Sequence, residues 1–271
     1  MPELPEVEWM ARTVRVHAIG RIVSAVLVLD SSGFHGPVGD IEGSRVLEAR
    51  RHGKYVRFDL GQRSLLVHCR MTGVIRWVDQ HISVGTSKPS DRSLRWRMNF
   101  EGGGAITFSD PRRLGQARIG TTSEIDGLLL DARLGPEPWP DPLPAEAWRD
   151  RLQGTRRSLK ECLMDQGKVA GLGNIAASEI CFRAQIHPRT SPNDLGDEAW
   201  TRLSEAAAAH LESTLAQLEK DGLELLSSNR KAAHSFLVYG RSGEPCPSCR
   251  APILAVRQGG RSTFFCERCQ R

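Results

Sequence analysis

The sequence predicts an α+β protein with an antiparallel β domain in its first half, a helical domain in its second half and a metal-binding β-hairpin at its C-terminus. Three observations predict this order. Short runs rich in β-branched and aromatic residues fill about the first 131 residues, five prolines crowd residues 134–144, and helical periodicity dominates beyond them. At 271 residues the chain is long enough for about two domains, each with a core of its own.

The first domain begins with a helix and continues as strands. Val7, Met10, Ala11 and Val14 recur at helical spacing before Gly20, which predicts an amphipathic helix over about residues 5–18. The alternating runs that follow predict an antiparallel sandwich or barrel that ends near residue 131. These runs are IVSAVLVLD (22–30), YVRFDL (55–60), SLLVHC (64–69), GVIRWV (73–78), WRMNF (96–100) and AITFSD (105–110).

The second half is predicted to be helical. The segment LGPEPWPDPLP (134–144) has little capacity for a helix or a sheet ladder, so it is interpreted as a connector. Helical periodicity follows in AWRDRL (147–152), SLKECLMDQ (158–166), NIAASEICFRAQ (174–185) and residues 197–221. We therefore expect domains at residues 1–131, 145–235 and 236–271, with a linker at residues 132–144.

The cysteines predict one metal site. Two Cys-x2-Cys pairs, sixteen residues apart, can place four thiolates tetrahedrally around one structural Zn²⁺. They are Cys246, Cys249, Cys266 and Cys269. The other three cysteines are scattered singly, which favours a reducing compartment over a disulfide framework. Gly259-Gly260 suits a tight hairpin turn between the pairs. The flanking Arg257 and Arg261 are either nucleic-acid contacts or solvated surface arginines.

The charge balance is compatible with a polyanionic partner. Lys and Arg total 37 against 32 Asp and Glu, a formal net charge of +5. No stretch approaches the roughly 20 apolar residues that cross a bilayer, and the first residues lack the basic-then-apolar order of a secretory signal. We expect a cytoplasmic protein without a membrane partner.

Three loops are candidate nucleic-acid contacts, each with a plainer alternative. GKVAGLGN (167–174) precedes a helix, so it either holds a phosphate at the helix start or is an ordinary helix end and turn. RRHGKY (50–55) and DPRRLG (110–115) place basic residues at strand ends, and Met71 could add an apolar wedge beside them. Singly, each of these two basic loops is more often a solvated loop than a binding site, and periodicity does not show that they meet the loop of Met71.

The opening MPELPEVE also has two interpretations. Pro5 and the acids suit the first turn of a helix. Alternatively, removal of Met1 leaves Pro2 as a terminal secondary amine, which titrates near ~8 and can attack a sugar carbon. Glu3 would then handle protons beside it.

Several segments resemble the formamidopyrimidine-DNA glycosylase family, the bacterial base-excision enzymes also called 8-oxoguanine DNA glycosylases. They are PELPEVE (2–8), LGPEP (134–138), LMDQGKVAGLGNIAASE (163–179), IHP (186–188), VYGRSGEPCPSC (238–249) and CERCQ (266–270). The resemblance implies a β-sandwich flanked by helices, then a helix-two-turn-helix domain with a zinc-finger hairpin. It also implies a monomer that binds damaged double-stranded DNA as a glycosylase and abasic-site lyase.

The resemblance carries roles to individual residues. Pro2 matches the nucleophile that forms an imine, Glu3 the acid-base residue and Glu6 a supporting carboxylate. Lys54 matches a lysine that holds phosphates around the lesion and serves catalysis.

The same resemblance supplies the DNA contacts. Asn174, Lys160 and Arg261 match phosphate contacts. Met71 and Arg112 match residues that fill the gap left by the everted base.

Departures from the family pattern leave alternatives open. Leu114 stands where a phenylalanine wedge is usual, and Ala176 where tyrosine is usual. Residues 222–235 resemble a shortened form of the lesion-capping loop. A preference for oxidised pyrimidines or hydantoins is therefore one alternative, and a non-catalytic zinc-dependent DNA-binding protein is another.

Overall fold

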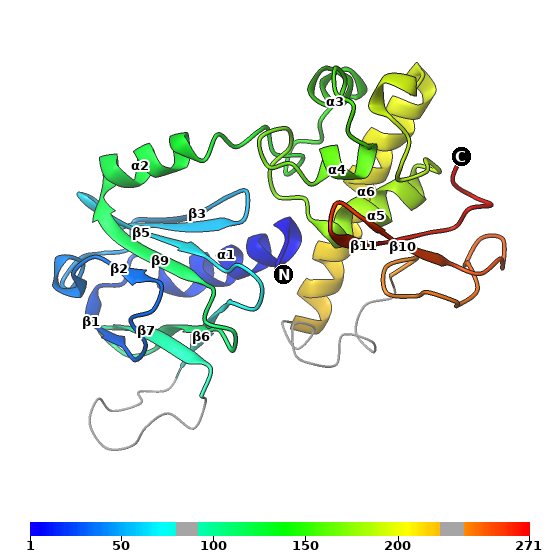
Figure 1. Cartoon of the computed structure of the whole chain (residues 1–271). Coiled ribbons are helices and arrows are strands. Elements are labelled where there is room, and N and C mark those ends of the chain that lie inside the picture. Colours follow the sequence, from blue (N-terminus) through cyan, green and yellow to red (C-terminus); the bar gives the residue numbers. More distant parts are fainter. Residues whose placement is uncertain (80–91, 223–235) are drawn as a thin grey trace. The chain divides into compact units, whose positions relative to one another are not determined.

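The computed structural model of the chain describes residues 1–79, 92–222 and 236–271 and divides into two compact units (Figure 1). The β unit comprises Met1–Pro2 and Glu6–Ala132, and the helical unit comprises Glu3–Pro5 and Arg133–Arg271. Of the expected linker, residues 132–144, all but Ala132 therefore lie in the helical unit. Helix α1, Leu4–Ala18, starts in the helical unit and continues in the β unit.

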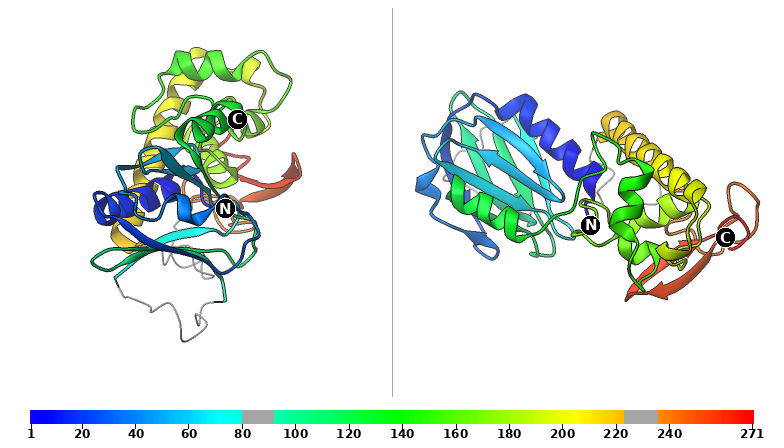
Figure 2. Two further views of the ribbon diagram at one scale, coloured as in Figure 1. Left: turned by 90° about the vertical axis from the view of Figure 1, so that its left-hand side faces the viewer. Right: turned by 90° about the horizontal axis from the view of Figure 1, so that it is seen from above.

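The β unit contains two sheets, drawn from further directions in Figure 2. The four-stranded sheet has the order β1 (Val23–Val28), β7 (Leu94–Phe100), β8 (Ala105–Ser109), β6 (Val74–Val78). The five-stranded sheet has the order β2 (Phe34–His35), β9 (Gln116–Thr121), β5 (Arg63–His68), β4 (Tyr55–Asp59), β3 (Glu48–His52). Neighbouring strands are antiparallel except β2 and β9. A 3-10 turn, η1, spans Val38–Asp40.

Helix α1 is bonded to both sheets. Its apolar stripe is fully buried, and the Met10 Sδ accepts from the amide of Ile75 on β6 at 3.1 Å. The half-buried Arg15 donates its Nε to the carbonyl of Ala49 on β3 at 2.7 Å, and buried Glu8 pairs with Arg51 at 3.0 Å. The expected helix over residues 5–18 is thus confirmed as a central element of the unit.

Two parts of the β unit differ from the expectation. Residues 122–131, expected to belong to the β region, form helix α2 (Thr122–Asp131), which begins with a reciprocal capping box between Thr121 and Glu124. Strands β3 and β9 were not predicted because EARRH and QARIGT contain few large apolar residues. Their buried positions alternate with exposed ones, and pairing with β4 and β5 outweighs their weak apolar pattern.

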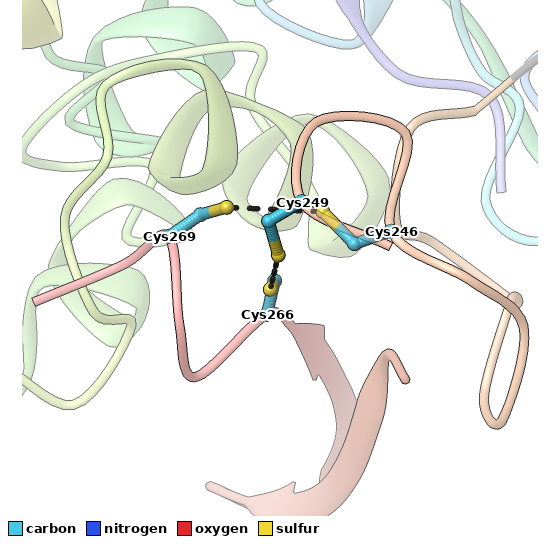
Figure 3. Close-up of side chains that lie close together, drawn as sticks. All are labelled: Cys246, Cys249, Cys266 and Cys269. Carbon is cyan, nitrogen blue, oxygen red and sulfur yellow. Dashed lines mark hydrogen bonds between the residues drawn. The ribbon is translucent and has the colours of Figure 1, made fainter. Parts of the chain in front are cut away.

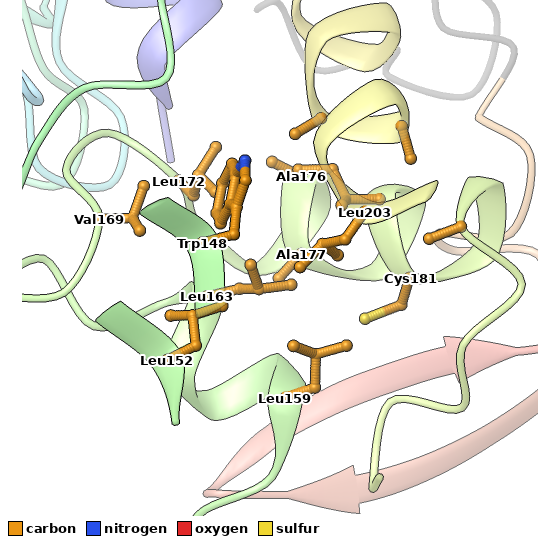
Figure 4. Packing of buried hydrophobic residues seen from close by; sticks show 14 of the residues in the cluster. Trp148, Leu152, Leu159, Leu163, Val169, Leu172, Ala176, Ala177, Cys181 and Leu203 are labelled. Carbon is orange, nitrogen blue, oxygen red and sulfur yellow. The ribbon is translucent and has the colours of Figure 1, made fainter. Parts of the chain in front are cut away.

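The helical unit packs around tryptophan and small aliphatic side chains. It contains α3 (Ala145–Leu152), α4 (Leu159–Leu163), α5 (Asn174–Arg183), η2 (Pro192–Asp194) and α6 (Asp197–Asp221). Trp148 from α3 packs in one core with Leu163 from α4 and Leu203 from α6 (Figure 4). Trp200 and Leu4, which comes from the start of the chain, belong to the same core. Within the described ranges, no helix is both long enough and apolar enough to cross a membrane.

The C-terminal hairpin consists of β10 (Leu254–Gln258) and β11 (Arg261–Phe265). Gly259 and Gly260 join the strands with φ angles of 54° and 76°, so both occupy the left-handed region that the sequence predicted for this turn. Phe182, Val238 and Ile253 form a small buried cluster with two of the four C-terminal cysteines. The hairpin has little apolar core of its own, as a metal-stabilised unit would.

Candidate functional site

The carboxylate of Glu3 is held at the start of α5. Its two oxygens accept backbone N–H groups from Gly173, Ile175 and Ala176, each at 3.0 Å. The residue is only 4% exposed. Helix N-termini favour negative charge because their first amides have no partner within the helix, so α5 supplies the setting that a buried carboxylate requires. Ala176, where tyrosine was expected, is buried and contributes one of these amides.

A second cluster joins the helical segments to the zinc hairpin. Lys160 is 2% exposed, and its Nζ donates to the carbonyl of Ser262 at 3.0 Å and to the Thr263 hydroxyl at 2.7 Å. Burial lowers the pKa of Lys160 to about 8. The side chain of Asn174 donates to the same Ser262 carbonyl at 3.0 Å. Lys160 and Asn174, which are both predicted phosphate contacts, therefore donate to Ser262. Ser262 directly follows exposed Arg261, the third predicted phosphate contact.

A buried glutamate in α5 binds the backbone of residues 237–239, shortly after the undescribed residues 223–235. Glu179 is 1% exposed and accepts the backbone amides of Leu237, Val238 and Tyr239, each at 2.9 Å. The ring of Tyr239 contacts Phe264 edge-on at 5.1 Å, and its hydroxyl accepts from Asn174 at 3.4 Å. Sequence reasoning missed Glu179, although a glutamate in the middle of an apolar helix face was a usable signal.

In the β unit, buried Asp110 links the loop of Met71 to the loop of Arg112. One carboxylate oxygen accepts the Thr72 hydroxyl, and the other accepts the amides of Leu114 and Gly115, both at 2.7 Å. Burial alone would raise the pKa of Asp110, but the hydrogen bonds from Thr72 and the loop amides outweigh it and hold the pKa below its ordinary value.

Asp110 thus joins the DPRRLG loop (110–115) to the loop that carries Met71. Met71 and Leu114 are 40% and 43% exposed, so both apolar side chains are accessible at the surface, and Arg112 is exposed as well. Asp110 itself was missed, although an aspartate before proline at a turn is a recognisable signal.

The remaining predicted catalytic residues lie at two places in the β unit. Lys54 is 7% exposed and follows Gly53, whose φ of 56° forms the turn between β3 and β4. Glu6 is 6% exposed in the first turn of α1, and Pro2 is buried. Glu3 belongs to the helical unit, so the convergence of these four residues on one substrate stays a prediction.

A cavity that is lined in part by Tyr55, the residue after Lys54, was also missed. This cavity of about 210 Å³ is lined by Tyr55, His68, Gln116 and Arg118 on neighbouring strands. Burial, together with the positive charges of Arg70 and Lys54, lowers the pKa of His68 to about 4, so this imidazole is neutral at pH 7. The facing pairs Tyr55–His68 and His68–Gln116 could not be read from the sequence, because β9 was not predicted as a strand.

The four C-terminal cysteines gather as one set (Figure 3). All four Sγ atoms lie within 4.8 Å of one another, with Cys249 and Cys266 3.4 Å apart and Cys246 and Cys269 3.8 Å apart. A tetrahedral Zn–S₄ centre with bonds of about 2.3 Å requires sulfur separations near 3.8 Å. The donor set therefore fits one structural Zn²⁺.

Matches to family models cover most of the chain. The N-terminal domain of formamidopyrimidine-DNA glycosylase matches residues 1–117, its H2TH (helix-two-turn-helix) domain residues 134–225, and the zinc finger found in FPG and IleRS residues 243–271. Fold and matches together define a helix-two-turn-helix protein with a zinc finger.

Whole-chain relatives identify the family. The formamidopyrimidine-DNA glycosylases of Acidithiobacillus ferrooxidans and Gluconobacter oxydans are each 36% identical and aligned over all of both chains. A crystal structure of Lactococcus lactis Fpg with DNA containing FAPY-dG matches with a TM-score of 0.86 and 27% identity, over 99% of this chain and 100% of that one. The chain belongs to the formamidopyrimidine-DNA glycosylase family.

Removal of one cysteine from the cluster should release the metal. We expect Cys266→Ser to lose its zinc and the order of the hairpin, because three thiolates and a hydroxyl bind Zn²⁺ far more weakly than four thiolates. Zinc content after dialysis and hydrogen exchange of the β10 and β11 amides measure both effects. Cys69→Ser, outside the cluster, is the control and should keep one zinc per chain. Full zinc retention by Cys266→Ser would contradict the assignment.

Neutralising Asp110 should weaken the β unit and reduce its sensitivity to acid. Asp110→Asn removes an acceptor from buried donors, which should lower the free energy of unfolding by about 2 kcal/mol at pH 7. Because the folded-state pKa is depressed, this stabilisation is fully present above about pH 4 and is lost as the pH falls through the folded-state value. Urea unfolding at several pH values tests both statements. Exposed Glu101→Gln is the control, and equal acid sensitivity of Asp110→Asn and wild type would refute the account.

Proposed function

We propose that this protein is a bifunctional DNA glycosylase and abasic-site lyase that removes oxidised bases from duplex DNA in base excision repair. The observation that carries the proposal is the fixed carboxylate of Glu3, one residue from the amine of Pro2. A terminal amine beside a held carboxylate suits attack on a sugar carbon with proton transfer. Family membership supports the glycosylase activity.

The reaction starts once Met1 has been removed. The nitrogen of Pro2 forms a bond to C1′ of the damaged nucleotide, the glycosidic bond breaks, and the base leaves with a proton from an acidic group. Opening of the sugar ring gives an iminium ion, because Pro2 is a secondary amine. Loss of a C2′ proton then expels the 3′ phosphate, a second elimination expels the 5′ phosphate, and water releases the sugar fragment. Glu3 serves as the principal acid-base group, with Glu6 and Lys54 in support.

The duplex must be opened at the lesion before this chemistry can begin. Turning a nucleotide out of the stack costs a few kcal/mol, which wedges and phosphate contacts offset. The exposed Met71, Arg112 and Leu114 are proposed to enter the vacated space. Arg261 is proposed to bind phosphate with Asn174 and Lys160 behind it, and the formal charge of +5 favours the approach to DNA. The enzyme would act as a monomer in the cytoplasm.

The proposed substrates are 8-oxoguanine and formamidopyrimidine lesions. Solved complexes of Lactococcus lactis Fpg include DNA with FAPY-dG and DNA with an oxidised pyrimidine. Leu114, smaller than a phenylalanine wedge, favours the second candidate, a preference for oxidised pyrimidines or hydantoins. The capping loop that also bears on this choice falls at residues 222–235, and all but the first of these lie outside the described residues.

The imine mechanism predicts a covalent intermediate at Pro2. With borohydride present, wild-type protein should crosslink to DNA carrying an abasic site, and peptide mapping should locate the bond at Pro2. Pro2→Gly and Glu3→Gln should lose base excision by about 100-fold or more, while DNA binding survives. Pro5→Ala retains the amine and is the control. Intact mass must first show that Met1 is absent, and no crosslink from such protein while it binds DNA would leave only a DNA-binding role.

Lesion choice can be measured with the same trapping reaction. Duplexes containing 8-oxoguanine opposite cytosine, a formamidopyrimidine, an oxidised pyrimidine or a hydantoin would be compared under single-turnover conditions. We expect the two purine lesions to be excised fastest. Faster excision of an oxidised pyrimidine or a hydantoin would replace the proposed substrate class by the second candidate. Leu114→Phe would then show whether the smaller wedge sets the choice.

A further inference from the structure

We propose that Gly173 and Gly171 are positioning residues for the reactive chain terminus. They form the surface on which Glu3 and Leu4 rest, and they thereby determine where Pro2 can lie. The inference rests on the proposed role of Pro2. It assigns the GLGN turn a task that the sequence did not suggest, because the turn receives the protein's own first residues.

Position 173 must be glycine because the carboxylate of Glu3 occupies the space that a side chain would need. The backbone conformation at this position does not itself require glycine. Its φ of −134° and ψ of −158° are extended values that any residue adopts. A Cβ at this position, however, would lie 2.3 Å from Oε1 and 2.4 Å from Cδ of Glu3. The carboxylate cannot retreat without breaking its three amide hydrogen bonds, and it is almost fully buried. A methyl group at residue 173 therefore displaces Glu3.

Gly171 contacts Leu4, the residue after Glu3, in the same way. Its carbonyl accepts the amide of Leu4 at 3.0 Å, and a Cβ here would lie 2.7 Å from Cδ1 of Leu4, which is fully buried. Its φ of 91° further disfavours any side chain. Gln166 braces the turn, donating from Nε2 to the carbonyl of Leu172 at 2.8 Å and accepting the Gly171 amide at 3.0 Å.

Two consecutive residues of the terminus are thus docked on two alternate glycines of one turn. The next residue toward the terminus is Pro2, whose Cα must lie about 3.8 Å from that of Glu3. Reacting groups need placement within a fraction of an ångström, and a displacement of about 1 Å can reduce a rate about 100-fold. Three amides at the start of α5 that could have bound a DNA phosphate are occupied by Glu3.

The test compares two glycine-to-alanine variants in the same unit. Gly173→Ala should reduce the single-turnover rate of borohydride trapping on abasic DNA about 100-fold. Its affinity for a duplex with an uncleavable tetrahydrofuran abasic analogue and its zinc content should stay at wild-type values. Gly196→Ala is the matched control, because Gly196 precedes α6 with φ −81° and a Cβ there would meet nothing within 4 Å. It should trap at the wild-type rate.

Each outcome decides the inference. Wild-type trapping by folded Gly173→Ala would overturn it while leaving the imine mechanism intact, whereas absence of a Pro2 crosslink in the wild type would instead overturn the proposed function. If Gly173→Ala fails to fold, amide exchange at Ile175 and Ala176 is measured in wild type and in Glu3→Ala, which keeps both glycines. Protection that depends on Glu3 supports the docking, and equal exchange in the two proteins refutes it.

Discussion

The contact between the Glu3 carboxylate and the first amides of α5 is the interaction on which the candidate site depends. It gives a buried negative charge three donors at the positive end of a helix, and it attaches the start of the chain to a turn about 170 residues later in the sequence. The same contact refines the helix-start interpretation of MPELPEVE, whereas the nucleophile interpretation stays a prediction. The acidic residues do mark a helix start, but Glu3 stabilises the beginning of α5, while α1 begins after it.

The same physical device recurs at two other positions. Asp110 and Glu179 are buried carboxylates that accept several backbone amides from a loop or turn. A buried carboxylate is costly unless its oxygens are satisfied, and neighbouring amides of an irregular segment need acceptors because no strand or helix supplies them. Each carboxylate therefore holds an irregular segment in one conformation. In each case the ordered segment carries residues proposed to meet DNA or to support those that do.

The sequence predicted elements whose determinants are local. The zinc hairpin follows from cysteine spacing and a Gly259-Gly260 turn, and α1 from its apolar stripe, so both could be identified without tertiary information. Strand β3 could not, because its arginines find partners only after folding, as Arg51 does with Glu8. The GLGN turn was given two interpretations, phosphate binding or an ordinary turn. Neither included Glu3, because its partner is far away in the sequence.

Helix α1 belongs to both units, and this constrains the length of the chain near its start. Leu4 is docked in the helical unit, whereas Val7, Met10, Ala11 and Val14 form its buried stripe in the β unit. An α-helix turns about 100° per residue, so a single insertion or deletion between Leu4 and Val7 would rotate one of these surfaces away from its partner. Substitutions there can be absorbed by repacking, but a change in length cannot. Residues 4–7 therefore tolerate a substitution better than a change in length, because each added or lost residue changes α1 by about 100° of rotation and about 1.5 Å of rise.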